Sequence, residues 1–484
     1  MLHCMSANQI PVVDLFAGPG GLGEGFSRVE DEKKLKVFKT VISIEKDPHA
    51  IDTLRLRSFY RSWVRSGREL PSAYLKVLSA EGTKARLSAI SELQKLREWD
   101  EARSEACLMT LGKNQRKKIH TEIRKRLSDT KTWVLIGGPP CQAYSLVGRS
   151  RMRNHEGLKA DHRHFLYKEY LKIIQKFQPT IFVMENVKGL NTAKVNGEKI
   201  LPKILEDLRA AVVGGYTLHS LEAGRTGLNA KPDDFLVKSE KYGVPQTRHR
   251  VIIVGVRNDY GVIPRPLAVK RLVSVANAIG DLPGLKGLMS TEDRDSCDPK
   301  DRGQPRTTGK KNLRNRLPAK LAEFMRPLSP RLSDSVLNHE ARSHMESDLL
   351  RYAWWASNVR LGRSPNIADL LAAGRSDLLP SHANLKDLAK GKASVFLDRF
   401  KVQVAKKPSG TITSHISKDG HYYIHYNSKQ ARSFSVREAA RIQTFPDDYF
   451  FMGNRTQQYH QVGNAVPPYL AYQIGQRVWA ALKG

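Results

Sequence analysis

A cysteine on a rigid turn is the residue in this sequence best placed for chemistry. Cys141 follows the segment 137–140, Gly-Gly-Pro-Pro, and the apolar run 133–136 before it is typical of a buried strand. Because proline fixes its own backbone torsion, a turn with two prolines holds the next side chain in one place. An isolated Pro-Cys pair is more often an ordinary turn with a buried cysteine, so other patterns must decide between the two interpretations.

A glycine-rich turn near the start of the chain predicts a nucleotide-type binding site. Residues 11–16 predict a strand, the glycine-rich turn follows at 17–23, a helix begins at 24–27, and the strand 41–44 ends on Glu45. This order is the Rossmann-type arrangement. The glycines let a ligand approach the backbone, the helix N-terminus favours an anionic group, and the acid can accept from two ribose hydroxyls. A nicotinamide dehydrogenase would fit this pattern equally well.

Further polar residues lie beside other predicted strands. The strand 180–184 leads into Glu185, which should lie at the same rim of an α/β sheet as Cys141. Three polar residues alternate ahead of the apolar strand 251–255, and they would project to one side of an extended segment: Gln246, Arg248 and Arg250. For any single arginine, a solvated salt bridge is the more common interpretation.

Strands and helices alternate along most of the chain, which predicts an α/β fold. The stretch of about 55–130 is mostly helical and interrupts this alternation, which resumes over about 131–257. Residues 271–427 contain many turns, an aromatic cluster and a basic run, and we expect a separate domain there. A helix over 435–443 has a serine N-cap with glutamate three residues on.

The composition indicates a polyanionic partner. The net charge is +32, and residues 306–331 hold eight basic residues against one acid. A nucleic acid is the first interpretation of this partner, and an anionic membrane surface is the second. The membrane is disfavoured because no basic amphipathic helix with a clean apolar face stands out. The four cysteines show no paired spacing, and the fifteen histidines show no metal-ligand spacing. With no secretory signal or membrane-spanning run, we expect a cytoplasmic protein in a reducing compartment.

The motifs resemble, in their order, those of the cytosine-5 DNA methyltransferases of bacterial or phage type. Six segments carry the resemblance: 14–21, 139–142, 185–187, 246–250, 437–446 and 463–466. One such segment would be weak, whereas six in the family's order are specific. The resemblance covers about 10–57, 131–257 and 406–484, and it leaves the two variable stretches outside.

The resemblance implies the fold and the domain organisation. It implies an α/β, Rossmann-like, S-adenosylmethionine-dependent methyltransferase domain with a second, smaller target-recognition domain. The catalytic domain would span 1–270, with the helical insertion at about 55–130. Residues 271–427 would form the target-recognition domain, and 428–484 would return to the catalytic domain.

The resemblance also implies the catalytic residues. Cys141 would attack carbon 6 of cytosine, so that carbon 5 can accept a methyl group. Glu185 would hold ring nitrogen 3 and the exocyclic amine, and Arg250 would contact the base carbonyl, with Arg248 and Gln246 supporting the site. Because a cytosine inside a duplex is inaccessible, the base must be flipped out.

By resemblance, S-adenosylmethionine is the methyl donor and no metal is needed. Its expected binding residues come from the glycine turn, the next strand end, the cysteine turn and the chain end: Asp14, Phe16, Gly18, Pro19, Gly20, Gly21, Glu45, Pro140, Leu166, Asn464, Ala465 and Val466. The family usually carries an acid on the third strand, near the adenine amine. The best-spaced candidate here, Ile119-His120, offers none.

The implied partner is double-stranded DNA, bound by a monomer associated with the bacterial nucleoid and not with a membrane. A cognate restriction endonuclease could be a separate chain, and a solitary or phage modification enzyme is the alternative role. Two other classes stay open: an RNA cytosine-5 methyltransferase, and a catalytically inactive DNA-binding homologue. The presence of Cys141, Glu185 and Arg250 disfavours the inactive class, and the large variable domain favours DNA over RNA.

Overall fold

The computed structural model describes residues 9–140, 166–195, 197–289, 317–380 and 400–483. Cys141 therefore lies one residue outside the described part of the chain. The basic run 306–331 is described only from residue 317 onward.

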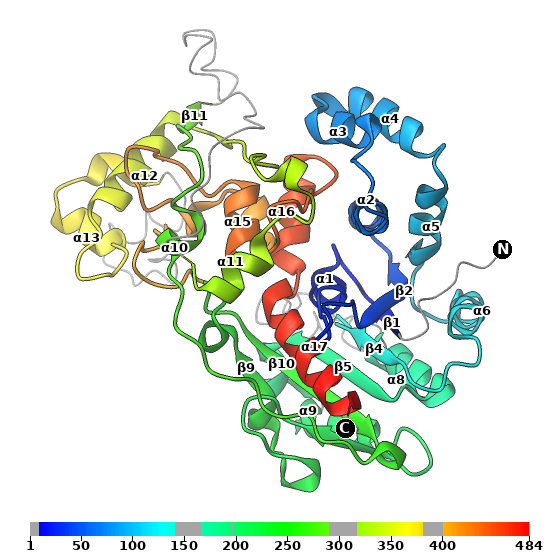
Figure 1. Cartoon of the computed structure of the whole chain (residues 1–484). Helices are drawn as coiled ribbons and strands as arrows, with labels where there is room; N and C mark the ends of the chain where they lie inside the picture. The colour runs from blue at the N-terminus through cyan, green and yellow to red at the C-terminus, as the bar shows by residue number, and fades with distance from the viewer. Residues whose placement is uncertain (1–8, 141–165, 196, 290–316, 381–399, 484) are drawn as a thin grey trace.

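A twisted sheet forms the centre of the molecule, with strand order β3-β2-β1-β4-β5-β10-β8 (Figure 1). Strands β1 to β5 pair in parallel, β10 pairs antiparallel with both β5 and β8, and β9 pairs with β10. The strands are β1 (Ile10–Leu15), β2 (Phe38–Glu45), β3 (Ala106–Leu108), β4 (Val134–Gly137), β5 (Ile181–Val187), β8 (Tyr216–His219), β9 (Leu236–Lys238) and β10 (His249–Arg257). The strands predicted at 11–16, 41–44, 133–136, 180–184 and 251–255 are confirmed within one to three residues at their ends.

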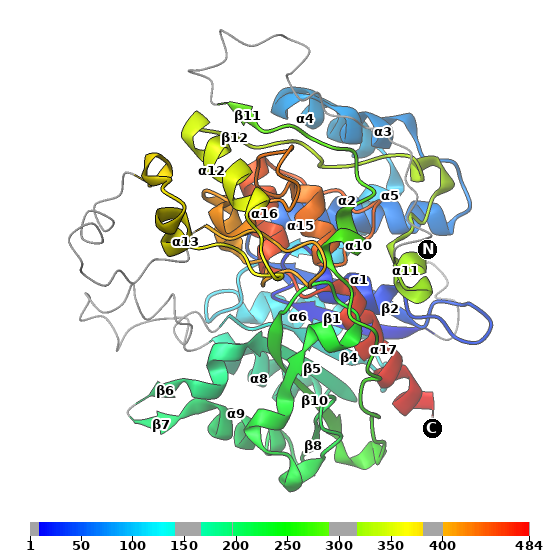
Figure 2. The ribbon, with the colours of Figure 1, turned by 90° about the vertical axis from the view of Figure 1, so that its left-hand side faces the viewer.

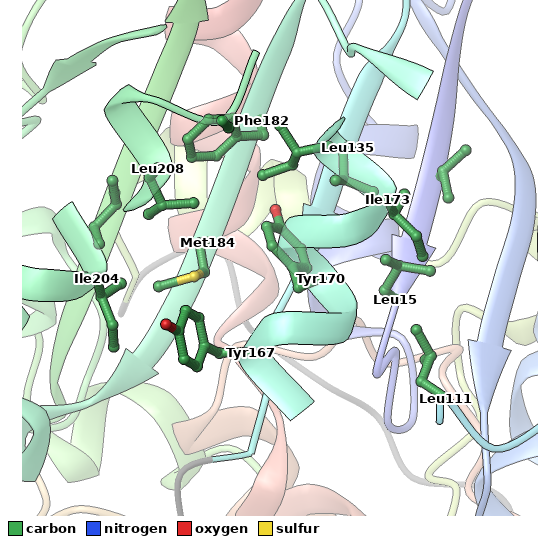
Figure 3. Close-up of a cluster of buried hydrophobic side chains, with 14 of the residues drawn as sticks. Leu15, Leu111, Leu135, Tyr167, Tyr170, Ile173, Phe182, Met184, Ile204 and Leu208 are labelled. Carbon is green, nitrogen blue, oxygen red and sulfur yellow. The ribbon is translucent and has the colours of Figure 1, made fainter. Parts of the chain in front are cut away.

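Helices cover both faces of the sheet, which explains why the central strands are almost continuously apolar. On one face lie α1 (Gly21–Ser27) and α17 (Pro468–Lys483), the last helix of the chain. On the other lie α6 (Arg116–Leu127), α8 (Leu166–Phe177) and α9 (Ile200–Arg209). Figure 3 shows Tyr167, Tyr170 and Ile173 of α8 packed over the sheet residues Leu135 and Met184. The chain end thus completes the layer begun by the first helix.

The predicted helical stretch contains α2 (Pro48–Arg65), α3 (Ser72–Ser79), α4 (Gly82–Leu93) and α5 (Arg97–Glu105). Its mostly helical character is confirmed, but the candidate third strand at Ile119-His120 is wrong, because those residues lie in α6. There Ile119, Ile123 and Leu127 are buried at helical spacing. The third strand is β3, only three residues long, which is too short for a periodicity to reveal.

The region after β10 is built from short elements. These are α10 (Val275–Ile279), β11 (Leu288–Met289), α11 (Ala319–Met325), β12 (Ser343–His344), α12 (Glu346–Ser357) and α13 (Ile367–Ala372). Figure 2 shows α12 and α13 away from the central sheet. The aromatic cluster noted in the sequence centres on the fully buried Tyr352 and Trp355, which pack with Phe400 and other residues of 352–426. This region therefore has a small core of its own.

The closing segments are α15 (Val436–Ile442) and α16 (Arg455–Asn464). The predicted cap of α15 is confirmed: the Ser435 hydroxyl accepts from the amide of Glu438, and the Glu438 carboxylate accepts from the amide of Ser435. A small antiparallel pair, β6 (Lys194–Val195) and β7 (Glu198–Lys199), precedes α9.

A buried ionic network joins the first helix to the insertion and to the chain end. Arg57 of α2 lies 2.5 Å from Glu24 of α1 and 3.0 Å from Asp448, and all three side chains are almost fully buried. Burial alone would raise the pKa of Glu24, but Arg57 and Arg28 outweigh it and hold the pKa of this carboxyl below its ordinary value. The network fixes α1, and with it the glycine loop, against α2.

Replacing Arg57 with methionine is expected to lower the free energy of unfolding by about 3–5 kcal/mol, because two buried carboxylates lose the cation that bridges them. Urea unfolding of the full chain measures this loss. Lys76→Met, which breaks an exposed pair with Glu92, should cost under about 1 kcal/mol. The contribution of Glu24 is complete above the pKa of an unfolded glutamate, about 4.3, and is lost as pH falls toward its folded pKa. The difference in the free energy of unfolding between wild type and Arg57→Met should therefore become smaller at acid pH. Equal losses of stability in Arg57→Met and Lys76→Met at neutral pH would refute a special role for the buried network.

Candidate active site

The glycine loop after β1 forms a cradle that side chains would fill. Gly20 has a φ of 90°, a left-handed conformation that favours glycine. A Cβ built on Gly21, the first residue of α1, would lie 2.1 Å from the backbone oxygen of Val466. The loop and the last sequence motif are therefore in direct contact, although more than 400 residues separate them.

The acid at the end of β2 closes one side of this cradle. The amide of Gly18 donates to the Glu45 carboxylate at 2.9 Å, and the amides of Lys46 and Asp47 donate to its other oxygen. Phe16 is half-buried, with a φ of 56°, a conformation rare for a residue with a side chain. A held carboxylate at the end of β2, beside a loop that carries an aromatic ring and leads into a helix N-terminus, fits a nucleoside ligand with a charged tail.

A carboxylate and a guanidinium meet at the base of the cysteine turn. Glu185 on β5 lies 2.9 Å from Nε of Arg250 on β10, and both side chains are largely buried. A Cβ on Gly138 would lie 2.8 Å from a Glu185 carboxylate oxygen. The Asn186 side-chain amide donates to the backbone oxygen of Pro139 at 3.1 Å. The acid motif therefore lies against the segment that leads into Cys141.

Comparison with known proteins identifies the family. Residues 80–480 match the C-5 cytosine-specific DNA methylases. The chain belongs to this family. It is 34% identical to the type II methyltransferase M.Bpa9945I of Bacillus paralicheniformis over 98% of this chain and 99% of that protein. It is 26% identical to the type II methyltransferase M1.HphI of Haemophilus parahaemolyticus, over 99% and 88%.

The fold of this DNA methylase has a solved counterpart. A chain described as a candidate DNA modification methyltransferase encoded within an E. coli prophage superposes with a TM-score of 0.59 at 19% identity, covering 98% of this chain and 100% of that one. This likeness supports the Rossmann-like α/β fold. The family implies S-adenosylmethionine as methyl donor, and the glycine cradle with Glu45 fits that molecule.

The structure brings the glycine loop, Glu45 and Val466 together, and it describes the other residues expected to bind the donor. Pro19 lies in the cradle, where its backbone oxygen accepts from the hydroxyl of Tyr449. Pro140 is half-buried at the end of the described turn, and Leu166 is the half-buried first residue of α8. At the chain end, Ala465 and Val466 are buried while Asn464 is exposed.

Asp14 stands apart from this set. Its carboxylate is fully buried beneath the loop, and a Cβ on Gly23 of α1 would lie 3.0 Å from one of its oxygens. Burial raises its pKa well above the ordinary value, and the charge of Glu45 adds to the rise. We therefore interpret Asp14 as a residue that supports the loop from behind.

Two of the expected catalytic residues of the methylase also act behind the site. Arg248 is 2% exposed and donates to the backbone oxygens of Ile412 and Gly463. Gln246 is fully buried, donates to Gln443 at 2.6 Å and accepts from the amide of Ile412 at 3.0 Å. These contacts tie β10 to the exit of the variable region and to the last motifs. Only Arg250 of the three contacts Glu185.

Sequence reasoning missed the true end of the third strand. Leu108 is 49% exposed and pairs in register with Glu45, so an apolar side chain borders the cradle. The amide of Met109 then donates to the backbone oxygen of Glu45 at 3.0 Å, and Thr110 is exposed. No acid occurs between residues 106 and 112, so the acid that the family usually carries on this strand is absent here.

Across the described ranges, no helix is long and apolar enough to span a membrane. Within those same ranges, no group of three or more His, Cys, Asp or Glu side chains is arranged to hold a metal ion.

Replacing Gly21 with alanine is expected to weaken S-adenosylmethionine binding at least about tenfold, because the added methyl group must displace the backbone of Val466. Isothermal titration with S-adenosylmethionine measures the change. Gly284→Ala is the matched control, since its Cβ would meet nothing nearer than 4.0 Å. Unchanged affinity in Gly21→Ala would show that the close approach does not shape the cradle.

Proposed function

We propose that this methyltransferase modifies carbon 5 of a flipped-out cytosine in a specific duplex sequence, with Cys141 as a transient covalent nucleophile. The observation that carries the proposal is the pair of Glu185 and Arg250 at 2.9 Å, against the turn that leads into Cys141. A carboxylate and a guanidinium side by side match the amine and carbonyl edge of cytosine.

In this mechanism, the Cys141 thiolate adds to carbon 6 and makes carbon 5 nucleophilic. Glu185 accepts from the exocyclic amine and shares a proton with ring nitrogen 3, so it stabilises the charge that develops in the ring. Arg250 donates to the base carbonyl. Asn186 keeps the backbone of Pro139, and so the cysteine turn, in place. Release of the proton from carbon 5 then lets the cysteine leave.

S-adenosylmethionine supplies the methyl group when bound. Gly18, Gly20 and Gly21 would accept its methionine end, Phe16 would lie against the adenine, and Glu45 would accept from the ribose hydroxyls. In this arrangement Glu45 exchanges its bond from the Gly18 amide for bonds from the ligand. Leu166 and the segment 464–466 would complete the wall.

The domain division is part of the proposal. Residues 1–270 and 428–484 would form the catalytic domain and 271–427 would read the target sequence from the major groove. The separate core around Tyr352 and Trp355 supports an independent reading unit. We also propose a role in restriction-modification, with any endonuclease as a separate chain, because several similar proteins are named type II methyltransferases.

Bisulfite sequencing of DNA from cells that express the protein tests the proposal. We expect one cytosine context to become resistant to conversion, and that context would also be the target sequence. DNA from cells that express Cys141→Ser is the control. No new protected context, with the protein present and folded, would contradict the proposal.

A further inference from the structure

Helices α6 and α8 lie side by side on the outer surface of the catalytic domain. The Arg116 guanidinium on α6 lies 2.6 Å from the Glu169 carboxylate on α8, and the rings of His120 and Phe177 are nearly perpendicular, with centroids 5.4 Å apart. Both helices pack on the same face of the sheet, and Figure 1 shows α6 on the side of the molecule where β2 lies. The two helices therefore present one continuous surface.

The exposed residues of this surface contain no acid. On α6 and α8 they are Lys117, Lys118, Thr121, Arg124, Lys125, Lys168, Gln175 and Lys176, which we call the α6–α8 basic face. The carboxylates of the two helices are both paired with bases, and Glu169 is buried while Glu122 is 28% exposed. Glu169 is held by Arg116 and Lys172, and Glu122 by Arg126.

An ordinary solvated helix face intersperses acids among its bases, because opposite charges four residues apart stabilise a helix and like charges destabilise it. On the α6–α8 basic face, by contrast, the exposed charged residues are all basic. Partial burial lowers the pKa of His120, and the nearby charges of Lys176 and Arg116 lower it further, as a locally positive potential requires. Such a concentration of positive charge is stabilised by a polyanion.

At the carboxyl end of α8, the face continues into a hollow of about 490 Å³. Its lining includes Lys131, Lys176, Phe177 and Tyr260, together with Asp259, which is paired with Arg257 at 2.7 Å. The Arg124 guanidinium lies 5.9 Å from the centre of the Phe177 ring. The hollow adjoins the amino end of β4 and the carboxyl end of β10. Because β10 runs antiparallel to β5, these ends lie at the edge of the sheet opposite to the glycine loop and Glu185.

We propose that the α6–α8 basic face binds the phosphate backbone of duplex DNA outside the segment held at the catalytic site. The proposal rests on the DNA methyltransferase function, which places duplex DNA next to this domain. Each helix of twelve residues is about 18 Å long, enough to follow several phosphates. Lysine and arginine at such a surface add affinity without reading sequence.

The test is a triple variant, Lys117→Gln with Lys125→Gln and Lys176→Gln. Its probe is a random-sequence duplex of about 200 base pairs. We expect an affinity at least about tenfold weaker near 0.15 M salt, and a salt dependence shallower by about 2 to 3 in log–log slope, since each lost phosphate contact removes about 0.9. The matching Lys→Arg triple variant should bind like wild type.

The control removes the same charge elsewhere: Lys33→Gln with Lys34→Gln and Lys95→Gln, three exposed residues far from the face in sequence. Equal losses in both triple variants, or no loss in either, would overturn the proposal. So would a loss confined to a transfer RNA probe, which would assign the face to RNA. Methyl transfer at saturating DNA should persist in the α6–α8 variant. An absence of methyl transfer in the wild-type protein would instead refute the enzymatic function.

Discussion

The Cys141→Ser enzyme is expected to transfer methyl groups at least about 10³-fold more slowly than wild type, a loss of about 4 kcal/mol in barrier lowering. A thiol near pKa 8.5 yields useful thiolate at neutral pH, whereas a serine hydroxyl is almost never ionised there. Serine keeps the size of the side chain, so donor binding should survive. Transfer of a labelled methyl group from S-adenosylmethionine to duplex DNA measures the rate, and isothermal titration measures donor binding.

Cys107→Ser is the matched control. Cys107 lies within the described part of the chain: it is 9% exposed on β3 and its thiol donates to the backbone oxygen of Ser104. Burial raises the pKa of its thiol, which makes it a poor nucleophile. We expect near wild-type activity from this variant. Full activity in Cys141→Ser, or a comparable loss in Cys107→Ser, would contradict the assignment of Cys141.

The Glu185→Gln enzyme is expected to lose about 10²- to 10³-fold in kcat. Glutamine preserves the shape of the side chain but can neither share a proton with ring nitrogen 3 nor balance the positive charge of Arg250. The effect should fall on kcat more than on KM, because the charge develops in the transition state. Single-turnover methylation of a short duplex that contains the target sequence measures it.

The neighbouring pair of Glu240 and His249, 2.8 Å apart, supplies the control. His249 is the first residue of β10, the strand that also carries Arg250. The Glu240→Gln variant should change kcat less than about threefold. Because Glu185 and Arg250 form a pair, the double variant Glu185→Gln with Arg250→Met should lose less than the product of the two single losses. Independent, multiplying losses would show that the two side chains do not act together on the base.

Much of the scaffold was predictable from local pattern. The strands β1, β4, β5 and β10 are apolar runs bounded by turn residues, and the cap of α15 is a local exchange between Ser435 and Glu438. The prediction failed where the signal was short or ambiguous. Strand β3 has three residues, too few for an alternation of side chains to reveal, and Ile119-His120 proved to lie in α6.

The sequence by itself determined the reaction class, because six motifs along the chain, in their order, resemble those of the cytosine-5 DNA methyltransferases. Only the tertiary structure decided what each residue touches. Arg248 reaches the backbone of Gly463, and Gly21 meets that of Val466, across hundreds of residues. Such contacts depend on how distant segments pack, and no local periodicity encodes them. The same packing buried Asp14 beneath the loop and joined α6 to α8 into one acid-free face.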